Sequence, residues 1–203
     1  MLAFTPGSHD YGQVIPGQAA SQTFTLANTG GPAAAATDAL TGNGSHLYWS
    51  SPGSGTIWEA GLDGSSPHVI ITGQHSPFGV AVDAGHLYWA SNSDGTIWQA
   101  GLDGTSPQAI ITGQDDPAGV AVGASSLYWA SFPAGNGAIS EAGMDSTTPH
   151  SILGAQSPNG VAAEASHLYW TDGNTINEAN PDGSSPHPIV TGQDLPYGVA
   201  VGS

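Results

Sequence analysis

Apolar residues in this chain fall in short runs separated by turn residues, and the runs return in the same order. In one stretch they are Gly79–Val82, Leu87–Ala90, Thr96–Ala100 and Gln108–Thr112. The pair Asp103-Gly104 joins the last two runs, and Asp-Gly between apolar runs is a strong hairpin signal. No stretch sustains the helical period of about 3.6 residues. The pattern therefore predicts short strands and almost no helix.

The set of four runs recurs along the chain as an internal repeat. Leu-Tyr-Trp stands at residues 47–49, 87–89, 127–129 and 168–170, so the copies are spaced 40, 40 and 41 residues apart. A four-stranded unit at this period is typical of a β-propeller blade. We predict an all-β propeller with complete blades over residues 38–72, 77–112, 117–153 and 158–191. The Gly-Val-Ala-Val strand is expected to be innermost, because small residues suit the crowded axis.

The Leu-Tyr-Trp segments extend into a longer motif. Residues 169–172 read Tyr-Trp-Thr-Asp, and the other copies read Tyr-Trp-Ser-Ser (48–51) and Tyr-Trp-Ala-Ser (88–91 and 128–131). Over about residues 38–203, with Leu-Asp-Gly turns at Asp63 and Asp103, the chain resembles the YWTD propeller family of low-density lipoprotein receptors and related bacterial extracellular propellers. The resemblance implies a six-bladed propeller whose motif aspartate, here present only as Asp172, forms hydrogen bonds between blades.

Residues 1–35 do not follow the repeat and are treated as a separate segment from the repeats of residues 36–203. A Phe-Thr-Pro start, an Asp-Tyr-Gly-Gln-Val run and a Thr-Leu-Ala-Asn-Thr-Gly strand end give this segment about three strands. These features resemble the opening strands of the hydin-type immunoglobulin-like family. Three short strands bury too little apolar surface to fold alone. We therefore expect this segment to pack against another part of the protein.

A fifth blade is the predicted place for that packing. The run Gly198–Val201 reads as an innermost strand without outer strands, and the first 35 residues supply three candidates. Closure within one chain and exchange between chains are both open, and exchange gives a ring or a filament because the two surfaces differ. The residues predicted for this strand closure are Phe4, Tyr11, Val14, Phe24, Leu26, Val199, Ala200 and Val201.

Composition narrows the range of functions. The chain has no Lys or Arg against 16 Asp and Glu, a formal net charge of −16. This excludes binding to a nucleic-acid backbone, which needs a basic surface, and argues against docking on anionic lipid through a polybasic patch. Cysteine is absent, and no run of about 18 apolar residues suggests insertion into a membrane. Since trypsin-like proteases find no cleavage site, we expect an extracellular or cell-surface protein.

Catalytic and metal-binding patterns are weak. No nucleophile elbow, phosphate loop or lyase-type constellation is visible, so we expect no enzymatic activity, with a lyase-like enzyme as the least favoured reading. No cofactor is expected beyond weak Ca²⁺ binding at loop carboxylates such as Asp115 and Asp116, with His75 and Asp194 at matching positions. Histidines recur at positions 46, 86 and 167, but equivalent positions on adjacent blades lie roughly 10 Å apart, too far to share one ion.

The leading hypothesis is an extracellular, non-enzymatic structural or interaction propeller that assembles with copies of itself by strand donation. The alternative is a lectin-like propeller that binds a carbohydrate or a protein on one loop face. The residues predicted for that ligand face are Gln74, Gln114, Gln156, Gln193, Trp58 and Trp98.

Overall fold

A computed structural model describes residues 41–42, 46–133, 136–145 and 148–202. The chain divides into two compact units, Met1–Ala35 and Ala36–Ser203, and all the described residues belong to the second. The hydin-type resemblance and the predicted closure residues Phe4, Tyr11, Val14, Phe24 and Leu26 therefore lie outside the described residues. The described part of the chain contains strands and turns and no α-helix, and so it contains no helix able to span a membrane.

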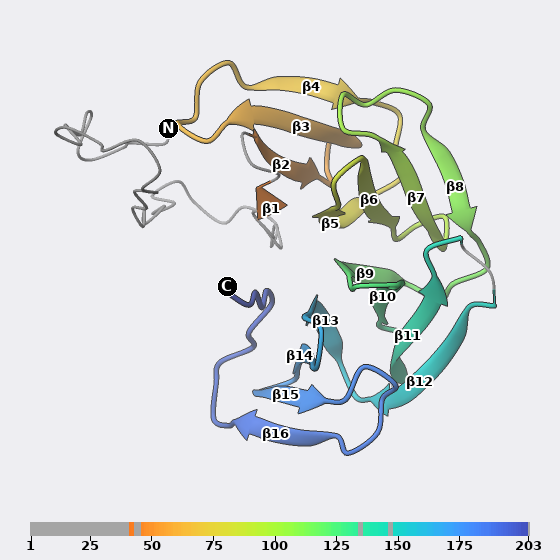
Figure 1. Cartoon of the computed structure of the whole chain (residues 1–203), viewed down its shortest axis with the longest axis vertical. Coiled ribbons are helices and arrows are strands. Elements are labelled where there is room, and N and C mark those ends of the chain that lie inside the picture. Colours follow the sequence, from red (N-terminus) through yellow and green to blue (C-terminus); the bar gives the residue numbers. More distant parts are fainter. Residues whose placement is uncertain (1–40, 43–45, 134–135, 146–147, 203) are drawn as a thin grey trace, which may run out of the picture. The chain divides into compact units, whose positions relative to one another are not determined.

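Sixteen strands within the described ranges form four antiparallel sheets of four strands (Figure 1). The first sheet comprises β1 (Thr41–Gly42), β2 (His46–Ser51), β3 (Thr56–Gly61) and β4 (His68–Ile71). The second comprises β5 (Pro77–Val82), β6 (His86–Ser91), β7 (Thr96–Gly101) and β8 (Gln108–Ile111). The third comprises β9 (Pro117–Val122), β10 (Ser126–Ser131), β11 (Gly137–Gly143) and β12 (His150–Ala155). The fourth comprises β13 (Pro158–Ala163), β14 (Leu168–Asp172), β15 (Thr175–Ala179) and β16 (His187–Val190).

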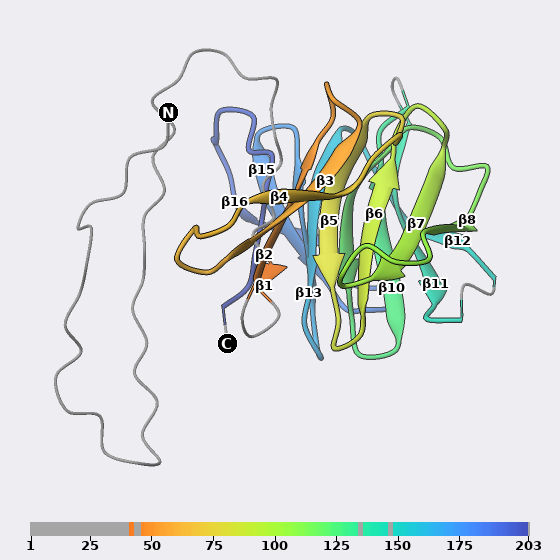
Figure 2. The same cartoon turned by 90° about the horizontal axis from the view of Figure 1, so that it is seen from above.

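Each sheet is one repeat of the sequence, which confirms the four predicted blades. Strands that follow one another in the chain are neighbours in the sheet, as Figure 2 shows for β5, β6 and β7. The register also repeats, because Val80 lies opposite Trp89, Val120 opposite Trp129 and Val161 opposite Trp170. β9 contacts both β5 and β13, and β4, β8, β12 and β16 form the outer edges (Figure 1). The Gly-Val-Ala-Val strand is therefore innermost, as predicted.

Apolar side chains from both faces of the blades form the core. At the boundary between the first two blades, Tyr48, Ile57 and Ile71 pack against Leu87 and Trp89. Equivalent residues form the cores of the second and third boundaries. Full burial of a side chain such as Leu87 stabilises the fold by about 1.5–3 kcal/mol. The cores between blades explain why Leu-Tyr-Trp runs need not alternate with polar residues.

Glycines bring the inner strands into close contact. A Cβ atom on Gly79 would lie 2.7 Å from the Cα of Gly119, and one on Gly119 would lie 2.9 Å from Val161 N and 3.1 Å from the Cα of Gly160. Real Cβ atoms essentially never show contacts below about 3 Å with a rigid backbone. The small residue at this position of the repeat is therefore a packing requirement between blades.

The segment after β16 takes the position of a further inner strand. A Cβ atom on Gly160 would lie 3.0 Å from the Cα of Gly198, and the Thr171 hydroxyl donates to Tyr197 O at 2.9 Å. Leu195 has a φ of 47°, close to the 46° of Asp116 at the matching place before β9. Residues 198–201, predicted as a strand, make no ladder with the described residues, because strand hydrogen bonding needs a neighbouring strand.

Candidate functional site

The most unusual surface of the described residues lies on the fourth blade. We call the side of a blade that packs against the next blade in the chain its leading face, and the opposite side its trailing face. Ile176 pairs with Val190 in the fourth blade as Ile57 pairs with Ile71 in the first. Ile71 is 4% exposed, whereas Val190 is 38% exposed and its neighbour Ile189 is 46% exposed. No described residue therefore covers Ile189 and Val190, which lie on the outer part of the leading face of the fourth blade.

A matching surface lies on the trailing face of the first blade. Leu47 and Trp49 are half-buried, although Leu87 and Trp89, at the same positions of the second blade, are completely buried. Leu62, on the turn after β3, is 52% exposed. At each internal boundary a leading face packs against a trailing face. The described residues leave one face of each kind partly uncovered, the leading face of the fourth blade and the trailing face of the first blade.

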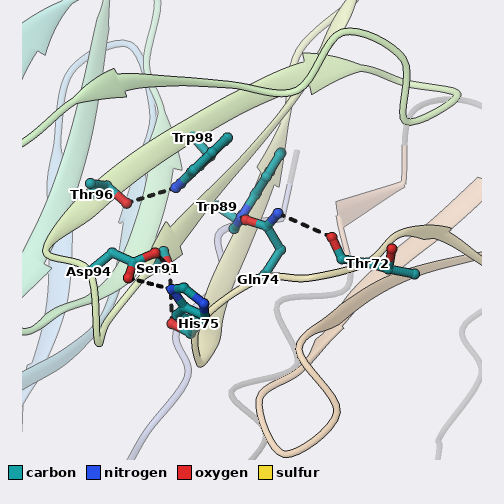
Figure 3. A network of polar contacts seen from close by, with 8 residues as sticks. All are labelled: Thr72, Gln74, His75, Trp89, Ser91, Asp94, Thr96 and Trp98. Atoms are coloured by element: carbon teal, nitrogen blue, oxygen red, sulfur yellow. Dashed lines mark hydrogen bonds and ion pairs between the residues drawn. The ribbon is translucent and has the colours of Figure 1, made fainter.

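An amide–indole hydrogen bond links the blades at two of these boundaries. Gln74, just after β4, accepts a hydrogen bond from Trp89 Nε1 at 2.9 Å (Figure 3). Its own amide nitrogen donates to Thr72 O at 3.4 Å, which orients the oxygen toward the indole. Gln114 accepts from Trp129 Nε1 at 3.0 Å in the same way. Two of the four glutamines predicted for a ligand face therefore serve the contact between blades.

The third boundary lacks this bond. Two residues separate Gln74 and Gln114 from the next proline, but one residue separates Gln156 from Pro158. The Nε1 atom of Trp170, whose side chain is 3% exposed, has no partner in the described part of the chain. The shortened loop borders a hollow of about 440 Å³ lined by Asn136, Gly137, Gly154, Ala155, Gln156 and Asp172.

Gln193, after β16, keeps the geometry of the bonded glutamines. Its amide nitrogen donates to Thr191 O at 3.3 Å, as Gln74 donates to Thr72 O. No indole of the described residues donates to its side-chain oxygen. Gln193 therefore marks the leading face of the fourth blade as equivalent to the leading faces of the first and second blades.

The motif aspartate forms the hydrogen bonds that the YWTD resemblance implies. Asp172 accepts from Gln156 N at 3.0 Å and from Ser157 N at 2.6 Å, in the loop before its own blade. In the second blade, Ser91 also bonds to the equivalent loop, but as a donor instead of an acceptor. Its hydroxyl donates to His75 O at 2.9 Å (Figure 3). Serine at the aspartate position thus retains a link from the blade to its preceding loop.

His75 belongs to the same network. Its Nδ1 lies 2.6 Å from Asp94 Oδ1, and Asp94 also accepts from the Ser91 hydroxyl at 3.1 Å (Figure 3). Asp116, in the matching loop before the third blade, has a φ of 46°. Across the described ranges, no three His, Asp or Glu side chains are placed to hold a metal ion. Weak Ca²⁺ binding by Asp115 and Asp116 stays a prediction.

Other histidines pair with carboxylates at the ends of the hairpins. His46 and His68 flank Glu59 at 3.3 and 3.8 Å, beside a hollow of about 200 Å³, and His167 lies 3.1 Å from Glu164. Because the chain contains no Lys or Arg, histidines are the side chains that pair with carboxylates in the described ranges.

A buried tyrosine and an aspartate form a further polar link inside the second blade. The Tyr88 hydroxyl donates to Asp83 at 2.9 Å. Burial raises the pKa of Tyr88, and the nearby Asp83 raises it further. Burial alone would raise the pKa of Asp83, but hydrogen bonds from Gly85 N, the Tyr88 hydroxyl and His86 N outweigh it and hold that pKa below its ordinary value.

Trp58 and Trp98, predicted for a carbohydrate platform, are half-buried. They stack on Trp49 and Trp89 with ring centroids 5.9 Å apart in both pairs. Trp98 Nε1 donates to the Thr96 hydroxyl at 2.7 Å, and Trp98 also packs against the core between the first two blades. Carbohydrate binding by this pair of positions stays a prediction.

Sequence reasoning did not single out the apolar residues that define the uncovered faces, namely Leu47, Trp49, Leu62, Ile189 and Val190. The repeat alignment contains the signal that identifies them, because each corresponds to a residue that lies at a boundary between blades or in a linker to the next blade. Only the burial of each position distinguishes the covered copies from the uncovered ones.

Comparison with known proteins supports the fold. No protein-family model matches the chain, and no curated protein does. Among solved structures, the chain is similar to one in the crystal structure of a nidogen/laminin complex, with a TM-score of 0.72 and 25% identity over 77% of this chain and 64% of that chain. TolB from Acinetobacter baumannii matches with a TM-score of 0.59 and 13% identity, over 71% of this chain and 41% of TolB.

The chain thus spans less than two thirds of the length of either matched chain. Both the architecture and the nidogen match support the β-propeller fold and the resemblance to the YWTD type.

Proposed function

We propose that this protein is an extracellular, non-enzymatic interaction propeller that assembles with copies of itself, blade against blade. The observation that carries the proposal is the pair of uncovered faces. The fourth blade exposes Val190 where Ile71 of the first blade is buried, and it exposes Ile189 where Ile70 is half-buried. The first blade leaves Trp49 half-buried where Trp89 of the second is buried.

The coarser role, a propeller that contacts other proteins, agrees with the fold neighbours. One of them comes from a complex between nidogen and laminin. A contact between the leading face of one copy and the trailing face of another is heterologous, so it extends into a ring or a filament. It would reuse a packing geometry that the chain already forms three times between its own blades.

Residues 198–201 supply the donated strand in this proposal. β1 pairs with β2 only at Tyr48 and Leu47, so no described strand pairs with the inner edge of β2 from Trp49 onward. The register of the other blades places Val199 opposite Trp49 of a second copy. The donated Gly-Val-Ala-Val strand then takes the place of the two-residue β1, and its backbone groups gain the partners that they lack among the described residues.

Light scattering of the full chain tests the proposal. We expect concentration-dependent oligomers for the unchanged protein. Ile189→Asp and Val190→Asp should weaken association by about tenfold or more each, because a carboxylate would be buried in the new boundary without a partner. Phe132→Asp is the matched control, since Phe132 is 41% exposed but lies on the third blade away from both faces.

The oligomeric states of the unchanged protein and of the variants decide the proposal. Association of the control variant together with dissociation of the Ile189 and Val190 variants would support the proposal. A strictly monomeric unchanged protein at every concentration would overturn it, and so would oligomers that survive both aspartate substitutions.

A further inference from the structure

Each uncovered face carries one partner of the amide–indole hydrogen bond that links the blades. The glutamine partner lies on the fourth blade and the tryptophan partner on the first. Gln74 and Gln114 each hold a tryptophan of the next blade, with the glutamine amide nitrogen fixed on a threonine carbonyl two residues earlier. Gln193 is fixed on Thr191 O in the same manner. The equivalent of Trp89 and Trp129 in the first blade is Trp49, whose indole is half-buried.

The four tryptophans of the repeat differ in their accessibility to a new partner. Trp89 and Trp129 are fully buried and donate to glutamines of their own chain. Trp170 is also buried, at 3% exposure. Trp49 alone among these four is partly exposed, and it lies on the face that is complementary to the fourth blade.

We propose that Gln193 of one copy accepts a hydrogen bond from Trp49 Nε1 of a second copy, and that this bond selects the first blade of an identical chain as the partner. This inference rests on the proposed function and names its partner. Backbone pairing of a donated strand is insensitive to side-chain identity, and a slip of one residue would reverse its faces. A directional side-chain bond at one position specifies both the register and the partner blade.

Electrostatics restricts other occupants of this face. Each chain carries a formal charge of −16 and no Lys or Arg, so a buried carboxylate partner would find no lysine or arginine to pair with. The side-chain oxygen of Gln193 accepts only a donor, and the surrounding Ile189 and Val190 favour an apolar one. An indole meets both conditions, because its single N–H lies on an apolar ring.

The test is a double-mutant cycle on the full chain with Gln193→Ala and Trp49→Phe, followed by sedimentation over a range of concentrations. Each single substitution should weaken association by about tenfold, the size expected for one part-buried hydrogen bond. The double variant should be no weaker than the weaker single variant, since both remove the same bond. Gln114→Ala is the matched control and should lower thermal stability while leaving association unchanged.

Mixing the two single variants gives a second measurement that a folding defect cannot imitate. In the mixture, Gln193 of the Trp49→Phe copy meets an unchanged Trp49 of the Gln193→Ala copy. The mixed pair should therefore associate with the affinity of the unchanged protein. Circular dichroism and the melting temperature of each variant confirm that the compared chains are folded.

The inference would be overturned by single variants that associate normally, by additive losses in the double variant, or by mixing that restores nothing. Any of these results can occur while Ile189→Asp still dissociates the oligomer. The hydrogen bond would then be wrong although the proposed assembly of blade against blade is right. A Gln193–Trp49 interaction that is independent of protein concentration would place the bond within one chain and would also overturn it.

Discussion

Trp129 Nε1 donates to Gln114 Oε1 at 3.0 Å across the boundary between the second and third blades. The indole is fully buried, whereas the glutamine is half-buried at the rim of the boundary. The bond satisfies the one polar atom of an otherwise apolar side chain in the core. It also ties the loop that ends one blade to the second strand of the next.

Gln114→Ala should destabilise the fold by about 1–3 kcal/mol, because it leaves the indole N–H buried without an acceptor. Denaturant unfolding of the purified protein measures the change. Gln156→Ala is the matched control, since the side chain of Gln156 holds no tryptophan among the described residues, and it should stay within about 0.5 kcal/mol of the unchanged protein. Equal losses in both variants would contradict this account of the bond.

Trp170→Phe should cost less stability than Trp129→Phe. Both substitutions remove the same indole volume from a boundary between blades. Trp129→Phe also removes a hydrogen bond, whereas Trp170→Phe removes a buried N–H that has no described partner. We expect a difference of about 1 kcal/mol in the free energy of unfolding. If the two variants unfold at the same denaturant concentration, the Trp170 N–H has a partner of comparable strength.

Gly119→Ala should destabilise the propeller strongly, by about 2 kcal/mol or more, because the added methyl group meets the backbone of Asn159 and Val161. The thermal midpoint of the variant tests this expectation. Gly154→Ala is the control within the same blade, since a Cβ atom there meets nothing within 4 Å and the backbone needs no positive φ. A tolerated Gly119→Ala would show that the inner strands can move apart at little cost.

Asp83→Asn should reduce stability at neutral pH and lose this effect in acid. The pKa of Asp83 is lowered in the folded protein, so its ionised form contributes stability above the ordinary aspartate pKa of about 3.9. That contribution falls as the pH drops through the lower folded pKa. Unfolding free energies of both proteins between about pH 6 and pH 2.5 should therefore converge at the acid end. A gap that stays constant over this range would exclude a role for the charge.

Self-association should strengthen with salt. Two copies that each carry a formal charge of −16 repel one another, and the Debye length falls from about 30 Å at 0.01 M to about 8 Å at 0.15 M salt. Light scattering across this range should show larger particles at the higher ionic strength. Dissociation on adding salt would mean that ionic contacts, rather than apolar faces, hold the copies together.

Much of the fold follows from local pattern. The predicted second blade, residues 77–112, corresponds to β5–β8 at 77–111, because apolar runs and Asp-Gly turns mark each strand end. The innermost place of Gly-Val-Ala-Val also follows, since only small residues fit the contact between Gly79 and Gly119. These features depend on neighbours along the chain, which a repeat displays directly.

The candidate site depends on contacts that the repeat does not display. Gln74 and Trp89 are 15 residues apart and on different blades, so their hydrogen bond appears only once the blades are packed. The role of Ser91, which stands at the repeat position of Asp172, also became clear only from the structure. Its hydroxyl donates to the preceding loop, where the carboxylate of Asp172 accepts. Val190 is exposed where its copies Ile71 and Ile111 are buried, although the local sequence hardly differs.

The close approach of inner strands at Gly79, Gly119, Gly160 and Gly198 has an evolutionary consequence. The contact is made by main-chain atoms and leaves no room for a side chain, so it imposes the same demand at the three described steps, at Gly79, Gly119 and Gly160. A tandem duplication of one repeat unit inserts a blade that already meets this demand on both sides. Genes of this design can change their blade number by recombination between repeats, without compensating substitutions along the axis.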